Sequence, residues 1–192
     1  MKNGSEKQFT VARWTKATFW GWLIGVVFIL MLSSFLGSIG IEDMQFYLGV
    51  GMGAGVGLAQ WWMLRKYVPI TQNWIWLSVI GMSIPFVVID LIPTVTSPLK
   101  LALSVALGSL TVGMLQYLLL KKHLKKASLW FWACFVGWTL AVLATKIIDY
   151  TMLIKVTGYM NLVLAFLNLL LILVGGVILG VISGIALKKM LA

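Results

Sequence analysis

The chain has 192 residues, of which 61% are hydrophobic and only 10% are charged, and its mean hydropathy is +1.01. A soluble domain carries about a quarter of its residues as charges, because a polar shell has to cover its core. The composition therefore excludes a soluble globule and predicts a single all-α integral membrane domain spanning residues 1–192. The net charge of +10 would suggest nucleic acid in a soluble protein, but here its distribution matters more than its sum, and we do not expect nucleic acid as a partner.

Six apolar runs are long enough to cross the hydrocarbon core as helices, which takes about 20 residues each. They lie near residues 17–40, 46–64, 74–95, 99–120, 128–149 and 162–187. The first run follows a basic leader, as in a signal peptide, but it matches the later runs along its length, so we expect it to be retained. The connections are short, and consecutive helices are therefore expected to be antiparallel.

Basic residues gather at the ends of these runs that lie on the side of the N-terminus. They are Lys2, Lys7, Arg13, Lys16, Arg65, Lys66, Lys121, Lys122, Lys125, Lys126, Lys188 and Lys189. The opposite ends hold Lys100, Lys146 and Lys155 together with Glu42, Asp43, Asp90 and Asp149. The positive-inside rule therefore predicts a multi-pass membrane protein with both termini in the cytoplasm. An aromatic belt is expected at that boundary, formed by Trp14, Trp20, Trp61, Trp62, Tyr67, Trp74, Trp76, Trp130 and Trp132.

The sequence repeats itself. A shift of 56 residues places Trp20 on Trp76 and then on Trp132, and the same shift places Gln60 on Gln116. A further shift of 67 residues brings Gln116 to Ser183, with the extra residues in the loop around 150–160. We therefore predict three tandem hairpins in parallel orientation, over residues 17–66, 73–122 and 128–189. Parallel repeats are related by an axis along the membrane normal, so a pseudo-threefold bundle is expected.

The second helix of the first two hairpins carries a Gly…Gln-Trp-x-x-Leu-Arg segment that leads into a Trp-rich helix. This pattern resembles a loose group of small, uncharacterised bacterial polytopic membrane proteins. The resemblance is carried by Gly57, Gln60, Trp61, Leu64 and Arg65, and by Gly113, Gln116, Leu120 and Lys121. The third copy departs from the pattern with Ser183 and Gly184. The resemblance implies a location in the bacterial cytoplasmic membrane and no established activity.

Glycines recur every fourth residue on two of the predicted helices. Gly49, Gly53 and Gly57 form one such face, and Gly176, Gly180 and Gly184 form the other. Helices in lipid gain little from hydrophobicity, so close backbone approach through small residues drives their association. These faces are predicted to pack against neighbouring helices.

A ring of polar residues is predicted about 7 Å inside the cytoplasmic boundary, because each member precedes a basic helix end by five residues. Its members are Gln60, Gln116 and Ser183, with Trp20, Trp76 and Trp132 at a similar depth on the neighbouring helices. Either each polar group hydrogen-bonds an indole N–H or a backbone carbonyl and fixes the hairpins, or the three groups line a pore or ligand cavity. We favour the first interpretation, since such bonds are common between membrane helices.

Charged residues also lie near the outer ends of the third and fifth runs, namely Asp90, Lys146 and Asp149. Ionisable groups at membrane depth are costly and are usually paired or functional. An ion pair between Asp90 and Lys146 is the preferred hypothesis, and extension of both side chains to the outer interface is the alternative.

The loop between the fourth and fifth runs holds Lys121, Lys122, Lys125 and Lys126. Such a cluster beside a span attracts anionic phospholipid, although topology determination explains it equally well. The single histidine, His123, lies in the same loop, so we predict no metal or other cofactor and no enzymatic activity.

Three functions are compatible with these features. The first is a non-catalytic membrane subunit that binds lipid, a membrane partner protein or a second copy of itself through its Gly- and Trp-rich faces. The second is a small transporter or channel with a permeation path along the pseudo-threefold axis. The third, and the least favoured, is a membrane enzyme that acts on a lipid.

Overall fold

The computed structural model describes residues 8–41, 44–92, 97–151 and 159–192, without the side chains of 97–98 and 149–151. These residues form six α-helices: α1 (Val11–Ser38), α2 (Phe46–Leu64), α3 (Asn73–Asp90), α4 (Ser97–Leu120), α5 (Ser128–Thr151) and α6 (Tyr159–Leu191). Each predicted run overlaps one helix, so the six-helix all-α prediction is confirmed. Thr10 starts α1, because its side-chain oxygen accepts a hydrogen bond from the backbone N–H of Arg13.

Five of the six helices are long and apolar enough to cross a membrane, and α2 is the exception. Its glycines and Gln60 lower its hydropathy, yet these residues are buried against other helices rather than exposed. The outer surface of the bundle, in contrast, displays large apolar side chains on every helix. These features indicate a multi-pass membrane protein in which α2 is the most enclosed element.

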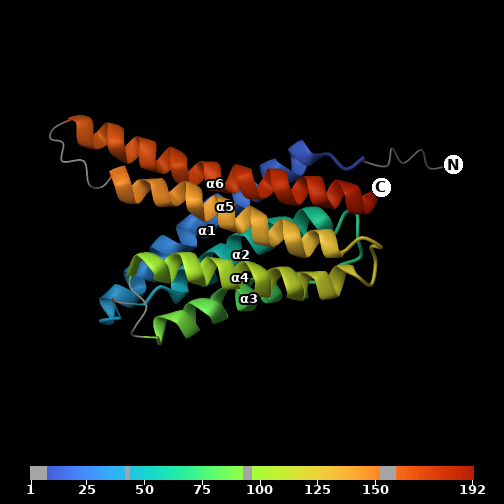
Figure 1. The fold of residues 1–192 in the computed structure, drawn as a ribbon, viewed down its shortest axis with the longest axis horizontal. Coiled ribbons are helices and arrows are strands. Elements are labelled where there is room, and N and C mark those ends of the chain that lie inside the picture. The colour runs from blue at the N-terminus through green and yellow to red at the C-terminus, as the bar shows by residue number, and fades with distance from the viewer. Residues whose placement is uncertain (1–7, 42–43, 93–96, 152–158) are drawn as a thin grey trace.

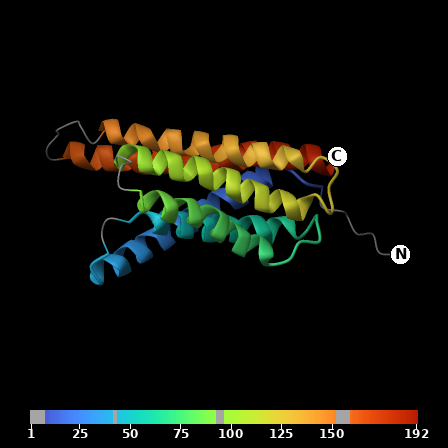
Figure 2. The same ribbon diagram turned by 60° about the horizontal axis from the view of Figure 1, so that its bottom comes forward.

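The helices form a closed ring in chain order, which we call the helix ring. Each helix packs against the next one along the chain, and α6 packs against α1 (Figures 1 and 2). The N-terminal end of α1 and the C-terminal end of α6 lie at the same end of the bundle, which we call the terminal end, and the other we call the distal end (Figure 1). A ring of this kind surrounds a central axis.

Glycines let α2 pack closely against both α1 and α3. The sequence predicted only one of these two contact faces, the one formed by Gly49, Gly53 and Gly57. A Cβ atom at Gly53 would lie 2.6 Å from the carbonyl oxygen of Ser78 on α3, and one at Gly49 would lie 2.8 Å from that of Met82. The opposite face packs on α1, where a Cβ at Gly55 would lie 2.6 Å from the Cα of Gly25. Because these contacts are with backbone atoms, no side chain larger than hydrogen fits without moving a helix.

The contact between α6 and α1 uses the second predicted glycine face. A Cβ at Gly180 would lie 2.8 Å from the Cα of Thr15, and one at Gly176 would lie 2.8 Å from the Cβ of Trp22. The buried residues of α6 all lie between Gly175 and Met190, so its first half is not enclosed. Both views show the first turns of α6 well separated from the last turns of α1 (Figures 1 and 2). This pair of helices therefore closes the helix ring at the terminal end and diverges at the distal end.

Candidate functional site

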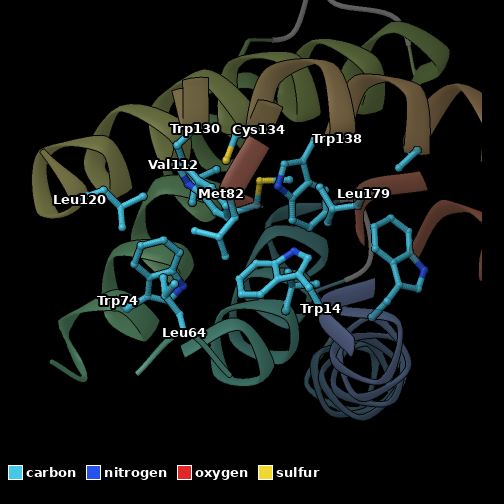
Figure 3. Packing of buried hydrophobic residues seen from close by; sticks show 14 of the residues in the cluster. Trp14, Leu64, Trp74, Met82, Val112, Leu120, Trp130, Cys134, Trp138 and Leu179 are labelled. Atoms are coloured by element: carbon cyan, nitrogen blue, oxygen red, sulfur yellow. The ribbon is translucent and has the colours of Figure 1, made fainter. Parts of the chain in front are cut away.

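The bundle axis at the terminal end is filled by three tryptophans. Trp14, Trp74 and Trp130 come from α1, α3 and α5, and all three are fully buried (Figure 3). The Trp130 ring meets those of Trp14 and Trp74 edge-on, with centroids 5.8 Å and 5.5 Å apart. The three intervening helices contribute the fully buried side chains of Leu64, Leu120 and Leu187. We call these six residues the tryptophan layer, and their complete burial indicates that, in the part of the chain the structure describes, their side chains fill the axis at this level.

Hydrogen bonds connect the tryptophan layer to the polar residues that the sequence singled out. The indole N–H of Trp130 donates to Oε1 of Gln116 at 2.8 Å, and the Gln116 amide donates to the Ser78 hydroxyl at 2.8 Å. The indole N–H of Trp14 donates to the hydroxyl of Ser183 at 2.9 Å. Both indole bonds join the first helix of one hairpin to the second helix of another, α5 to α4 and α1 to α6.

The prediction that Trp20, Trp76 and Trp132 belong to the polar ring is wrong. They are 55%, 64% and 59% exposed and lie on the outer surface, whereas the tryptophans that bond to the polar ring are Trp14 and Trp130. The belt assignment is wrong for Trp14, Trp74 and Trp130 as well, because they are core residues.

The sequence match also misplaced the register of the first hairpin. A Cβ at Gly21 would approach the Cα of Val56 to 3.1 Å, just as one at Gly81 would approach the Cα of Val112 to 2.8 Å. Gly21 and Gly81 each follow a tryptophan of the layer, Trp14 or Trp74, by seven residues. The structural equivalence between α1 and α3 is therefore a shift of 60 residues. The sequence match of Trp20 to Trp76 uses a shift of 56 residues instead, which differs from the structural shift by about one helical turn.

Gln60 occupies the remaining position of the polar ring. Its side chain is buried, and it lines a cavity of about 10 Å³ together with Ser78 and Gln116. This is the smallest space that accepts a water molecule. The indole nitrogen of Trp74, which is the equivalent of the bonded nitrogens of Trp14 and Trp130, has no hydrogen-bond partner within the described part of the chain. The polar ring is thus bonded to an indole at two of its three positions.

Beyond the polar ring a second, much larger cavity of about 310 Å³ occupies the distal half of the axis, and we call it the central cavity. Met82 and Trp138, which Figure 3 shows in the core, line both cavities. The Trp138 ring lies 5.5 Å from that of Trp22. All six helices line the central cavity: Val26, Leu48, Phe86, Val105, Val142 and Ile172 represent α1 to α6 in order.

The lining of the central cavity is almost entirely apolar. Thr145 is the one side chain among its lining residues with a hydroxyl, and that hydroxyl donates to the carbonyl oxygen of Val142 at 2.8 Å. The indole N–H of Trp22 is buried and has no hydrogen-bond partner among the described residues. Trp138 adds a second indole N–H, and the remaining lining side chains are hydrocarbon, phenyl or thioether groups. Such a site suits an apolar guest, since a polar one would lose its hydrogen bonds to water.

The outer charged residues lie near the distal end. The Asp90 carboxylate accepts a hydrogen bond from the backbone N–H of Gln45 at 2.6 Å, which holds the end of α3 to the start of α2. Lys146 is half-buried on α5, and the side chain of Asp149 lies outside the described residues. The pairing of Asp90 with Lys146 stays a prediction.

The basic cluster of the α4–α5 loop is on the surface. Lys121, Lys122, Lys125 and Lys126 are all exposed, and the ammonium of Lys121 lies 5.7 Å from the centre of the Tyr117 ring. Contact of this cluster with anionic lipid stays a prediction. Within the described parts of the chain, no three His, Cys, Asp or Glu side chains gather as metal ligands.

No family model matches the chain, and no curated protein or solved structure shows significant similarity to it.

Proposed function

We propose that this chain is a non-catalytic protein of the cytoplasmic membrane that holds an apolar molecule, such as a lipid acyl chain, in its central cavity. The observation that carries the proposal is the cavity of about 310 Å³, which is lined by apolar side chains from all six helices. Its volume lies at the lower end of the range of ligand sites, which begins at about 300 Å³.

Membrane insertion with six crossings is part of the proposal. It is supported by five helices of sufficient length and apolarity, and by the position of α2 between two of them in the helix ring. The basic residues Arg65, Lys66, Lys188 and Lys189 follow or end helices at the terminal end, so we assign that end to the cytoplasm.

We further propose that the three hairpins are repeats about a pseudo-threefold axis. Positions that the repeat makes equivalent have the same burial: Gln60, Gln116 and Ser183 are all buried, and so are Leu64, Leu120 and Leu187. The hydrogen bond from Trp130 to Gln116 has its counterpart in the bond from Trp14 to Ser183. A common unit copied twice accounts for both observations.

A permeation path along the axis is the weaker candidate. Two members of the polar ring that would line it are engaged in hydrogen bonds, and the tryptophan layer fills the axis next to it. A bound apolar molecule needs no passage through that layer, because it can enter from the bilayer on the distal side, where α1 and α6 diverge (Figure 1).

Filling the central cavity tests the proposal. Val142→Trp places an indole in the cavity, and Val136→Trp places the same indole on the exposed face of the same helix. Each protein is purified in mild detergent, and the molecules that travel with it are identified by native mass spectrometry. We expect an apolar molecule with the wild type and with Val136→Trp, and its loss from Val142→Trp. Equal retention by all three proteins would contradict the proposal.

A further inference from the structure

A second hollow lies on the outside of the bundle, between α1 and α2 in their terminal halves. It is a groove of about 400 Å³ lined by Ala17, Trp20 and Ile24 of α1 and by Leu58, Ala59, Trp61 and Trp62 of α2. Trp20 and Trp62 are each 55% exposed. The two helices nearly touch beside the groove, where a Cβ at Gly21 would lie 2.6 Å from the Cβ of Ala59. The groove therefore combines small alanines with large indole walls.

Two cations lie at the terminal end of this groove. The guanidinium of Arg65 lies 4.6 Å from the centre of the Trp61 ring, and the ammonium of Lys66 lies 4.7 Å from that of Trp62. Both rings line the groove, so each cation is held over one of its walls. Asp90, the carboxylate whose side chain the structure describes, lies at the distal end of α3 and does not neutralise them. The apolar groove therefore has two exposed positive charges at its terminal end.

We propose that this groove binds one anionic phospholipid, with an acyl chain along Trp20 and Trp62 and the phosphate at Arg65 and Lys66. The proposal rests on the membrane insertion and orientation proposed above, but its site is separate from the central cavity. Charge complementarity selects the anionic headgroup, and basic residues at the cytoplasmic surface attract such lipids. Indole rings suit the boundary between headgroups and chains, because they carry both an apolar body and a polar N–H.

The second hairpin offers a direct comparison. Its residues Lys121 and Lys122 correspond to Arg65 and Lys66, but Leu118 stands where the first hairpin has Trp62. The outward position that corresponds to Trp20 is Ile80 when α1 and α3 are matched by the 60-residue shift. The same pair of charges therefore occurs there beside Tyr117, which corresponds to Trp61, but without indoles at the positions of Trp20 and Trp62. The site is therefore assigned to the first hairpin alone.

Lipid titration tests this assignment. Delipidated protein in detergent is titrated with phosphatidylglycerol, or with phosphatidylcholine of the same acyl chains, and bound lipid is counted by native mass spectrometry. We expect one site that prefers phosphatidylglycerol by about tenfold or more, since each basic residue contributes about fivefold. Arg65→Gln with Lys66→Gln should abolish that preference, and Trp62→Leu should weaken binding of both lipids.

The control variant, Lys188→Gln with Lys189→Gln, removes the same charge from two exposed lysines at the end of α6 and should change the affinity less than about twofold. Equal binding of the two lipids by the wild type, or equal loss in both charge variants, would overturn the assignment. The substituted side chains are exposed, and an unchanged thermal unfolding transition checks that the fold is kept. Val142→Trp should keep the phosphatidylglycerol site, so failure of the central cavity and failure of the groove give different results.

Discussion

The terminal and distal halves of the bundle are built from the same six helices but are packed in different ways. In the terminal half, the tryptophan layer and the side chains of Gln116 and Ser183 that are hydrogen-bonded to it fill the axis. In the distal half, the axis holds a cavity of about 310 Å³. The first half of α6 exposes apolar side chains such as Leu162 and Phe166. The comparison indicates that one half of the bundle is closely packed along its axis and the other half contains a large cavity.

The length of α6 also differs from what the terminal half of the bundle requires. Its 33 residues span about 50 Å, which is longer than the hydrocarbon core needs. Burial along this helix begins at Gly175, and the residue before it, Val174, is 43% exposed. The extra length therefore lies at the distal end, where α6 diverges from α1.

The largest effect is expected at the glycine contact between α1 and α2. Gly55→Ala places a Cβ against the backbone of Gly21 and Gly25, so α1 and α2 have to separate. Overpacking of this kind costs about 3 kcal/mol, and we expect the unfolding temperature in detergent to fall by on the order of 10 °C. Gly37→Ala is the matched control on α1, because a Cβ there meets nothing within 4 Å. Equal melting of the two variants would mean that α1 and α2 do not approach through Gly55.

The next effect concerns the polar ring. Gln116→Leu removes the acceptor of the Trp130 N–H and the donor to Ser78, and leaves a buried indole N–H unsatisfied. We expect a loss of about 2 kcal/mol in the free energy of unfolding. Gln60→Leu should cost less, because the indole N–H of Trp74 is already without a partner among the described residues. Chemical denaturation of both variants measures the difference, and a larger loss for Gln60→Leu would refute the described bonding.

A smaller effect is expected where α6 meets α1. Ser183→Ala removes the acceptor of the Trp14 N–H, which we expect to cost about 1 kcal/mol. Ser38→Ala is the control, since the Ser38 hydroxyl is exposed and bonds to the Phe35 carbonyl of its own helix. The same denaturation assay compares them. If the two substitutions lowered the free energy of unfolding equally, the Trp14–Ser183 hydrogen bond would contribute nothing to the contact between α6 and α1.

The smallest effect belongs to the distal half. Phe166→Ala on the exposed part of α6 should change the free energy of unfolding by less than about 0.5 kcal/mol. Leu179→Ala, in the enclosed part of the same helix, is the matched comparison and should cost at least about 2 kcal/mol. A large loss for Phe166→Ala would show that the first half of α6 is packed in the native protein, against this chain or a second copy.

Much of the fold follows from the sequence. The number of helices follows from the apolar runs, and the packing of α2 and α6 follows from glycines at every fourth position. The register of α1 relative to the later repeats does not follow from the sequence. A shift of four residues is close to one helical turn of 3.6, so it keeps every side chain on nearly the same face and periodicity cannot detect it.

The candidate site is harder to predict from the sequence than the fold is. A spacing of seven residues between Trp14 and Gly21 recurs in Trp74 and Gly81, and this signal identifies the tryptophan layer in retrospect. The central cavity has no comparable signal. Its volume depends on how far side chains such as Phe86 fill the axis, and only their positions in three dimensions determine that.

The central claim is that α1 and α6 close the helix ring at the terminal end and diverge at the distal end, and disulfide crosslinking tests it most directly. With Cys134→Ala as background, Val11→Cys is combined with Gly184→Cys at the terminal end, where a Cβ at Gly184 would lie 3.1 Å from a Val11 methyl carbon. Phe35→Cys is combined with Leu162→Cys at the distal end. After oxidation in membranes, we predict an intramolecular crosslink for the first pair and none for the second. A crosslink in the distal pair, or its absence in the terminal pair, would contradict the account.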